Sequence, residues 1–431
     1  MLSSRLPKDL SPSPFFAELE RAKAEVLAEC AVADGLVGNA GANALPFIDM
    51  TVSSPVRAGL PIDMDAAVEV ARKDFGCWNP DAAGWMSTRE AVVEYYRARG
   101  GNFDAGQIIL TASTSEAYSI LFKAFCDPGD VILTPMPGYP LLDTLAQLEH
   151  LECAPYFLKL RRENGPSTKL RGLTKFTEPA EVNAKSTFRF VLDTDSLLSA
   201  PERAKILLLV SPHNPTGHCV SRSEWNEVVS FCEQHNLILV VDEVFGDYGF
   251  SDDVRRSWTF LAEARSEGPK CPIFWLNGLS KAVGSPQLKL GWMAFYAPEE
   301  QFEPIRAALE FVEDAYLSVS APAQALGTAL LKQSVAYEAK VRARLLQNWN
   351  TLREAFPSKY CPEVLGGWYA AIRLGDDDEE LTLRLLREKH VLVQPGFFFD
   401  FDEDGWVVVS LLAPPEQFRE AVSRMQVLDR P

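Results

Sequence analysis

Several features that would mark a metal-binding, secreted or membrane protein are missing from this chain. Its eight cysteines include no C-x-x-C pair, and its five histidines lack the spacing of metal ligands. No zinc or disulfide framework is therefore expected, and reduced intracellular thiols are the simplest interpretation. The first residues lack an apolar core of signal-peptide length, and no apolar run reaches the length of a membrane span. We expect a cytoplasmic protein.

An excess of positive charge is missing too. The formal net charge is −17, with 42 Lys and Arg against 59 Asp and Glu. Nucleic acids and anionic membrane surfaces are bound chiefly through Lys and Arg. The balance therefore argues against both as partners, although a local cluster of donors can still bind a small anion.

What is present is an ordinary globular composition and enough length for two domains. The chain has 431 residues, of which 47% are hydrophobic and 23% are charged. We expect an N-terminal arm and helix over residues 1–46, a large ligand-binding domain over 47–304 and a small domain over 305–431. The polar segment 161–185 is interpreted as a surface insertion.

From residue 107 onward, apolar runs typical of strands alternate with helical patterns. Expected strands cover residues 47–51, 108–111, 131–134, 154–158, 206–210, 237–241 and 273–276. Expected helices cover residues 15–30, 89–98, 115–125, 141–148, 223–235, 305–315 and 325–355. This alternation predicts an α/β fold, with a mainly parallel, doubly wound sheet in the large domain and a smaller α+β domain.

The stretch around Lys281 is the centre of the predicted site. Lys281 lies among small and hydroxyl residues, directly after the expected strand 273–276. Ligands of α/β proteins bind at the carboxyl ends of strands. Burial disfavours the charged form of a lysine, and the neutral amine is a nucleophile. Most lysines are exposed, so Lys281 alone would be interpreted as a loop residue, but three other strand ends carry polar groups.

These three strand ends carry Ser113, Thr114 and Ser115, then Asn214, then Asp242. The first group begins a helix, where free N–H groups suit a phosphate. Asn214 lies in a turn stiffened by two prolines and a glycine. Asp242 ends an apolar strand, where a carboxylate needs a partner such as a cationic ring nitrogen. Taken singly, a capped helix and a plain turn are the simpler interpretations of the first two.

Together with Lys281, these features describe pyridoxal 5′-phosphate. Its aldehyde would condense with Lys281, and its phosphate would lie at the helix start. Asn214 would meet the ring oxygen and Asp242 the ring nitrogen. A carboxylate that keeps this nitrogen protonated makes the ring an electron sink, and the released lysine amine can move the substrate α-proton.

The motif order resembles that of the fold-type I, class I and II aminotransferases, including their 1-aminocyclopropane-1-carboxylate synthase-like branch. The resemblance runs from about residue 47 to residue 425. Each motif alone is weakly specific, whereas the ordered set is specific. In chain order the motifs are Pro128-Gly129-Asp130, Pro137-Gly138-Tyr139-Pro140, Asn214-Pro215-Thr216-Gly217, Asp242-Glu243, Ser280-Lys281 and Leu290-Gly291-Trp292.

The resemblance implies a role for each of these residues. Lys281 would be the catalytic residue that forms a Schiff base with the cofactor. Asp242 would pair with the pyridine nitrogen, Asn214 would bond the ring hydroxyl oxygen, and Tyr139 would stack on the ring. Family members are homodimers with sites at the subunit interface, so a homodimer is expected here. The cofactor phosphate would be held by Ser113, Thr114, Ser115, Ser280 and Lys289.

The chain departs from the family pattern near the cofactor. Phe245 replaces a tyrosine usual three residues after the aspartate, which removes a hydrogen bond to the ring oxygen. We therefore expect the pKa of the Schiff-base nitrogen to rise. Lys289 replaces a phosphate-binding arginine and lacks its two-pronged geometry. Trp78 or Asn79 lies near the position of a tyrosine that the neighbouring subunit contributes.

The most informative departure is Val408, which occupies the position of the arginine that binds the substrate α-carboxylate. Losing a two-pronged charged contact removes on the order of several kcal/mol of carboxylate binding unless another cation replaces it. Arg255 and Arg256 are candidates, although a solvated loop pair is the plainer interpretation of them. We therefore expect an unusual substrate that is large, apolar, or has its carboxylate masked or bound elsewhere.

Three functions remain open on the sequence alone. The first is a pyridoxal-phosphate enzyme that acts at Cα of an amino-acid-type substrate, most simply by transamination. The second is a lyase of secondary metabolism that eliminates across a carbon–sulfur bond, and no sequence feature separates it from the first. The third is an inactive family member that binds or regulates, against which Lys281, Asp242 and Asn214 argue.

Overall fold

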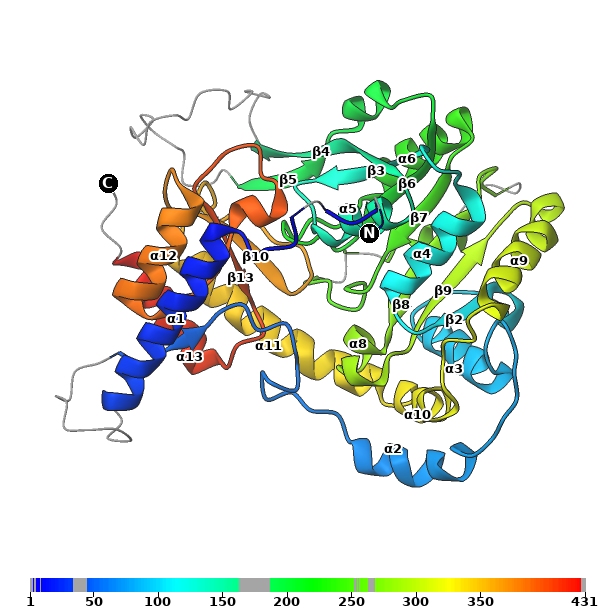
Figure 1. Ribbon diagram of the computed structural model, residues 1–431, viewed down its shortest axis with the longest axis horizontal. Helices are drawn as coiled ribbons and strands as arrows, with labels where there is room; N and C mark the ends of the chain where they lie inside the picture. Colours follow the sequence, from blue (N-terminus) through cyan, green and yellow to red (C-terminus); the bar gives the residue numbers. More distant parts are fainter. Residues whose placement is uncertain are drawn as a thin grey trace.

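We describe the fold from a computed structural model of the chain (Figure 1). Its described residues are 3, 5–7, 9–33, 45–162, 187–251, 254, 256–262 and 268–427. Nearly all of the predicted insertion over 161–185 and all of Arg255 lie outside these residues.

An eight-stranded sheet forms the centre of the fold. Its strand order is β2-β9-β8-β7-β6-β3-β4-β5. Strands β9 and β5 run opposite to the others, so the sheet is mixed but mostly parallel, as predicted. The strands are β2 (Ile108–Thr111), β3 (Val131–Met136), β4 (Glu152–Arg162), β5 (Phe188–Leu192), β6 (Ala204–Val210), β7 (Ile238–Asp242), β8 (Ile273–Gly278) and β9 (Gly291–Tyr296).

Helices cover both faces of this sheet because alternate apolar residues of each strand point to opposite sides. In β6, Ile206 and Leu208 pack on one side, whereas Leu207 and Leu209 pack on the other. The first side is covered by α4 (Thr114–Phe125), α5 (Leu141–Leu148) and α9 (Glu299–Asp314). The second is covered by α3 (Met86–Arg97), α6 (Arg222–His235) and C-terminal elements. Because both faces of the sheet are covered, its central strands are continuous apolar runs in the sequence.

A three-stranded antiparallel sheet of order β10-β13-β12 lies beside the large sheet. A short parallel pair, β1 with β11, links an early segment to a late one. Figure 1 shows these elements on the side of the molecule that carries α1, α12 and α13. Their bounds are β1 (Ile48–Asp49), β10 (Tyr369–Arg373), β11 (Val391–Leu392), β12 (Gln394–Pro395), β13 (Trp406–Ser410), α1 (Pro14–Ala33), α12 (Asp378–Lys389) and α13 (Pro415–Gln426).

The remaining helices connect these two parts. Helix α10 packs on α2 and α3, and α11 packs on α13. The predicted helix over 325–355 is two helices, because the chain turns at Lys332 and Gln333. The bounds are α2 (Met64–Ala71), α7 (Trp258–Ala262), α8 (Leu279–Ala282), α10 (Ala321–Leu331) and α11 (Ser334–Ala355), with short 3-10 turns η1 (Arg72–Asp74), η2 (Ala105–Gln107), η3 (Thr194–Ser199), η4 (Pro286–Leu288) and η5 (Gly396–Phe399).

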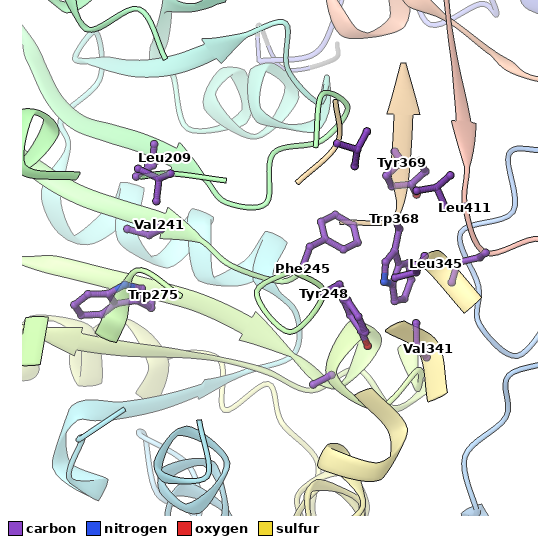
Figure 2. Close-up of a cluster of buried hydrophobic side chains, with 14 of the residues drawn as sticks. Leu209, Val241, Phe245, Tyr248, Trp275, Val341, Leu345, Trp368, Tyr369 and Leu411 are labelled. Atoms are coloured by element: carbon purple, nitrogen blue, oxygen red, sulfur yellow. The ribbon is translucent and has the colours of Figure 1, made fainter. Parts of the chain in front are cut away.

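One apolar core extends from the large sheet to the C-terminal elements. Figure 2 shows Trp275 and Val241 on the large sheet, Phe245 and Tyr248 beyond the strand ends, and Trp368 beside α11. All five side chains are buried. The division into units over 1–46, 47–304 and 305–431 stays a prediction.

No helix in the described part of the chain combines the length and the apolar character of a membrane-crossing helix. Helix α1, the longest helix near the N-terminus, instead buries Phe15, Leu19 and Val26 against Leu386 of α12.

Candidate active site

A cavity of about 370 Å³ lies at the carboxyl ends of β6, β7 and β8. Its wall includes Val210, Asp242 and Gly278, the last residues of these three strands. Parallel strands bring their carboxyl ends to one edge, which is why sites form there. Every residue predicted for the site lines this cavity, namely Ser113, Thr114, Ser115, Tyr139, Asn214, Asp242, Ser280, Lys281 and Lys289.

Lys281 lies in the short helix α8, directly after β8. Its Nζ is 4.6 Å from the ring centroid of Trp368 and 5.3 Å from that of Phe245. Burial lowers the pKa of Lys281 to about 8, although the charge of Asp242 acts in the opposite direction. The hydroxyl of Tyr248 donates to the Lys281 carbonyl oxygen at 2.6 Å and holds the backbone in place. The amine is therefore far easier to deprotonate than that of an exposed lysine.

Asp242 is held by two hydrogen bonds, and neither was predicted from the sequence. The Tyr118 hydroxyl donates to its Oδ2 at 2.7 Å, and the Val244 N–H donates to its Oδ1 at 3.0 Å. Burial raises the pKa of Asp242, whereas these two bonds and the charge of Lys281 lower it. Tyr118 follows Thr114 by one helical turn on the inner face of α4, and that spacing is the signal that could have identified it.

Asn214 lies in a compact turn after β6. The peptide bonds before Pro212 and Pro215 are cis, and Gly217 N–H donates to the His213 carbonyl oxygen at 2.8 Å. Gly217 has φ +68°, and a Cβ there would lie 2.4 Å from the Val364 side chain, so only glycine fits. Oδ1 of Asn214 is buried and has no hydrogen-bond partner in the described part of the chain. A buried amide oxygen of this kind calls for a bound group.

The start of helix α4 faces the same cavity. The Ser113 side chain accepts from Glu116 N–H at 3.1 Å and caps the helix. The N–H groups of Thr114 and Ser115 belong to the first turn, which has no helical acceptors for them. Gly291 lets β9 approach closely, because a Cβ there would lie 3.0 Å from the Ser113 carbonyl carbon. These features form an anion-binding cradle.

Three further predicted positions differ in exposure. Tyr139 lines the cavity with 51% of its surface exposed, and Lys289 is an exposed residue with φ +51° at the cavity wall. Phe245 is buried against Trp368 and Tyr369, and it brings a hydroxyl-free ring to the cavity. Trp78 and Asn79 instead line a separate pocket of about 90 Å³, where Trp78 is 81% exposed.

Val408 is fully buried in β13, opposite Ala371 and Gln394. Among the described residues that line the cavity, Lys281 and Lys289 are the positive side chains. Arg256 is neither solvated, as its plainer interpretation held, nor at the cavity. Its Nη2 lies 2.8 Å from Glu338, and the ion pair is partly buried. No arginine therefore replaces the missing one in the described wall.

A buried charge network lies behind the Lys281 stretch and was not predicted. Asn277, four residues before Lys281, donates to the Tyr95 hydroxyl at 3.0 Å, and Tyr95 donates to Asp247 at 2.8 Å. Arg99 Nε donates to Asp247 at 2.7 Å, and Arg99 Nη2 lies 2.9 Å from Glu338. These residues come from distant parts of the chain, so no local sequence pattern announces them.

Comparison with known proteins shows the family of this chain. A family model described as "Aminotransferase class I and II" matches residues 79–425. An alanine aminotransferase of Mycobacterium bovis is 30% identical over 360 residues, which cover 80% of this chain and 76% of that protein. The glutamate-pyruvate aminotransferase AlaA of Haemophilus influenzae is 26% identical over 392 residues, 88% of this chain and 89% of that protein.

Solved structures agree on the fold. An aminotransferase from Escherichia coli superposes with a TM-score of 0.75 at 21% identity, covering 99% of this chain and 97% of that one. An alanine aminotransferase from Pyrococcus furiosus gives 0.73 at 20% identity, covering 96% and 98%. At this identity the likeness concerns the fold alone, which is the predicted fold type I. The proposed synthase-like branch is not tested by these matches.

Proposed function

The chain belongs to the aminotransferase class I and II family, whose members use pyridoxal 5′-phosphate, and from this we propose that it transfers the amino group of an unusual amino-acid-type substrate. The observation that carries the proposal is the position of Lys281. Its amine, with a pKa lowered to about 8, shares one cavity with the Asp242 carboxylate and the first turn of α4. We assign Lys281 as the catalytic residue.

The residues of the cavity fit this cofactor. Asn214 lines the cavity, and its amide N–H would donate to the ring oxygen. Asp242 would face the ring nitrogen, and Tyr139 would stack on the ring. Thr114, Ser115, Ser280 and Lys289 would hold the phosphate beside Ser113, which caps the helix. When bound, the cofactor supplies an electron sink that makes the substrate Cα–H bond acidic.

Residues of the protein then transfer the α-proton of the substrate. The amine of Lys281, once free, takes up the α-proton of the substrate, because its lowered pKa leaves a large neutral fraction near pH 8. Phe245 and Trp368 place apolar rings beside this amine and limit its hydration. The Tyr118 hydroxyl orients Asp242 and opposes the effect of burial by lowering the pKa of this carboxyl.

We further propose that the substrate lacks a free α-carboxylate at the usual place or is large and apolar. The support is Val408, an apolar side chain at the position where the family has its carboxylate-binding arginine. A carboxylate that is buried without a nearby cation loses its hydration, and no new interaction compensates for this loss. Elimination at a carbon–sulfur bond, or an inactive binding role, is favoured by no feature of the described residues and serves as an outcome of the test.

The same proposal includes two predictions, one about the oligomeric state and one about the cellular location. A homodimer is supported by large aromatic side chains left exposed in the single chain, because Trp78 and Phe311 are each 81% exposed and Tyr316 is 58% exposed. A cytoplasmic location is supported by the eight cysteines, which are all free thiols. Sedimentation of the purified protein with and without Trp78→Ser tests the first, since the variant should dissociate more readily.

The test of the proposed function uses the purified protein loaded with pyridoxal 5′-phosphate and a panel of amino donors and cysteine S-conjugates. Transamination predicts an oxo product formed in step with an aminated acceptor. Pyruvate, ammonia and a thiol would instead identify the lyase. Lys281→Ala should abolish either reaction, while the exposed Lys332→Ala control keeps it. Undiminished turnover by Lys281→Ala, or a wild-type protein that takes up cofactor and converts no donor, would contradict the proposal.

A further inference from the structure

We propose that the wall of the cavity built by the small sheet binds a neutral carboxamide of the substrate and discriminates against a carboxylate. This wall consists of Gln394, Tyr369 and Ser53, which all line the cavity. The inference rests on the proposed function, since it names the chemical class of substrate for the same site.

The strand register places Gln394 and Tyr369 on one face of the small sheet. Gln394 of β12 and Ala371 of β10 are both opposite Val408 of the central strand β13. Directly opposed residues of antiparallel strands point to the same side of the sheet. Tyr369 is two residues from Ala371, so it shares that side. Because Gln394 and Tyr369 both line the cavity, this face of the small sheet is its wall.

The polar groups on this wall are neutral and have bonding capacity left. Oε1 of Gln394 is buried and has no hydrogen-bond partner among the residues that the structure describes. Burial raises the pKa of the Tyr369 phenol, which therefore stays protonated, and its hydroxyl shares a hydrogen bond with Ser53. A buried amide oxygen without a partner is costly, which favours a ligand that donates to it.

Positive charge is lacking on the same wall. The described cations of the cavity, Lys281 and Lys289, come from α8 and from the residue after η4 and belong to the proposed cofactor site. Arg373 is the guanidinium further along this face of β10, but it is paired with Glu403 and does not line the cavity. A carboxylate at this wall would thus meet the acceptor oxygen of Gln394, and no positive side chain of the described wall would compensate its charge.

A carboxamide matches the wall better than other neutral groups. The side chain of Gln394 offers both an acceptor and a donor, and a carboxamide offers the complementary pair. A hydroxyl or an ester can satisfy fewer of these positions. We therefore assign Gln394 as a specificity-determining residue for an amine that carries a carboxamide.

The test compares L-alaninamide with L-alanine on the cofactor-loaded protein, with Kd taken from the absorbance change on binding. The wild type should bind the amide about tenfold more tightly, as expected for one or two neutral hydrogen bonds. Gln394→Leu should lose this preference by weakening amide binding alone. Gln394→Arg should invert it. The exposed Gln234→Leu on α6 is the matched control and should bind both ligands as the wild type does.

A second pair, propionamide and propionate, probes the wall without an amine and without turnover. At equal concentration the amide should raise the melting temperature of the protein more than the acid, with or without cofactor. Equal or tighter binding of the carboxylates, or equal losses for both ligands in Gln394→Leu, would overturn the inference. Failure of the cofactor to bind would refute the proposed function instead, and the second pair would still decide this inference.

Discussion

The pKa of Lys281 can be tested directly on the protein without cofactor. Burial lowers this pKa to about 8, against an ordinary value of 10.5. At pH 7.5 the neutral fraction is then roughly 24%, compared with about 0.1% for a lysine at 10.5, a ratio of about two hundred. Trace acetylation over a pH series, read peptide by peptide by mass spectrometry, should give a midpoint near pH 8 for Lys281. Exposed Lys332 serves as the reference for reagent strength.

The effect of the Asp242 charge on the pKa of Lys281 provides a second test. The Asp242 charge raises the pKa of Lys281, whereas burial lowers it. Asp242→Asn removes the charge but keeps the shape, so the midpoint should fall further, by on the order of one pH unit. Asp65→Asn, at an exposed position of helix α2, should leave it unchanged. A wild-type midpoint near 10, or a midpoint that rises in Asp242→Asn, would refute the reasoning.

Three further predictions concern residues that lie behind or beside the cavity. Arg99→Met removes the shorter of two arginine contacts of the buried Asp247, leaving Arg256 at 3.4 Å, and should cost about 3 kcal/mol of unfolding free energy in urea. Arg97→Met, which removes an exposed pair, should cost under about 1 kcal/mol. Burial raises the pKa of Glu243 from 4.5 to about 8, so the native state binds more protons than the unfolded chain between these values. Stability should therefore fall as pH rises toward and through 8, and Glu243→Gln should flatten this dependence of the melting temperature. Gly291→Ala should weaken cofactor binding in a fluorescence titration by displacing the start of α4, and unchanged affinity would contradict the close approach.

Much of the fold could be predicted because the relevant signals are local. The apolar runs at 206–210 and 273–276 are buried strands, and the helical pattern over 223–235 is α6. Two strands of the large sheet were missed for physical reasons. Strand β9 runs antiparallel between β2 and β8, and β5 pairs antiparallel with β4, so neither follows the parallel strand–helix alternation. The split between α10 and α11 was missed because no glycine or proline marks it.

The predicted site residues meet in one cavity because nearly all of them lie at or just after the carboxyl end of a parallel strand. Lys289 instead precedes β9, whose opposite direction places its start at the same edge of the sheet. What could not be predicted depends on contacts between distant segments. Tyr118 reaches Asp242 across 124 positions, and Asn277 reaches Tyr95 across 182. Gln394 becomes visible as a cavity residue only when the register places it opposite Val408.

The most direct test of the account is to identify the residue that carries the cofactor. The protein loaded with pyridoxal 5′-phosphate is reduced with borohydride, digested and mapped by mass spectrometry. We predict the added mass on the peptide containing Lys281, and its loss in Lys281→Ala. Attachment at Lys289 or another lysine in the wild type, or no attachment at all, would contradict the assignment of Lys281 as the catalytic residue.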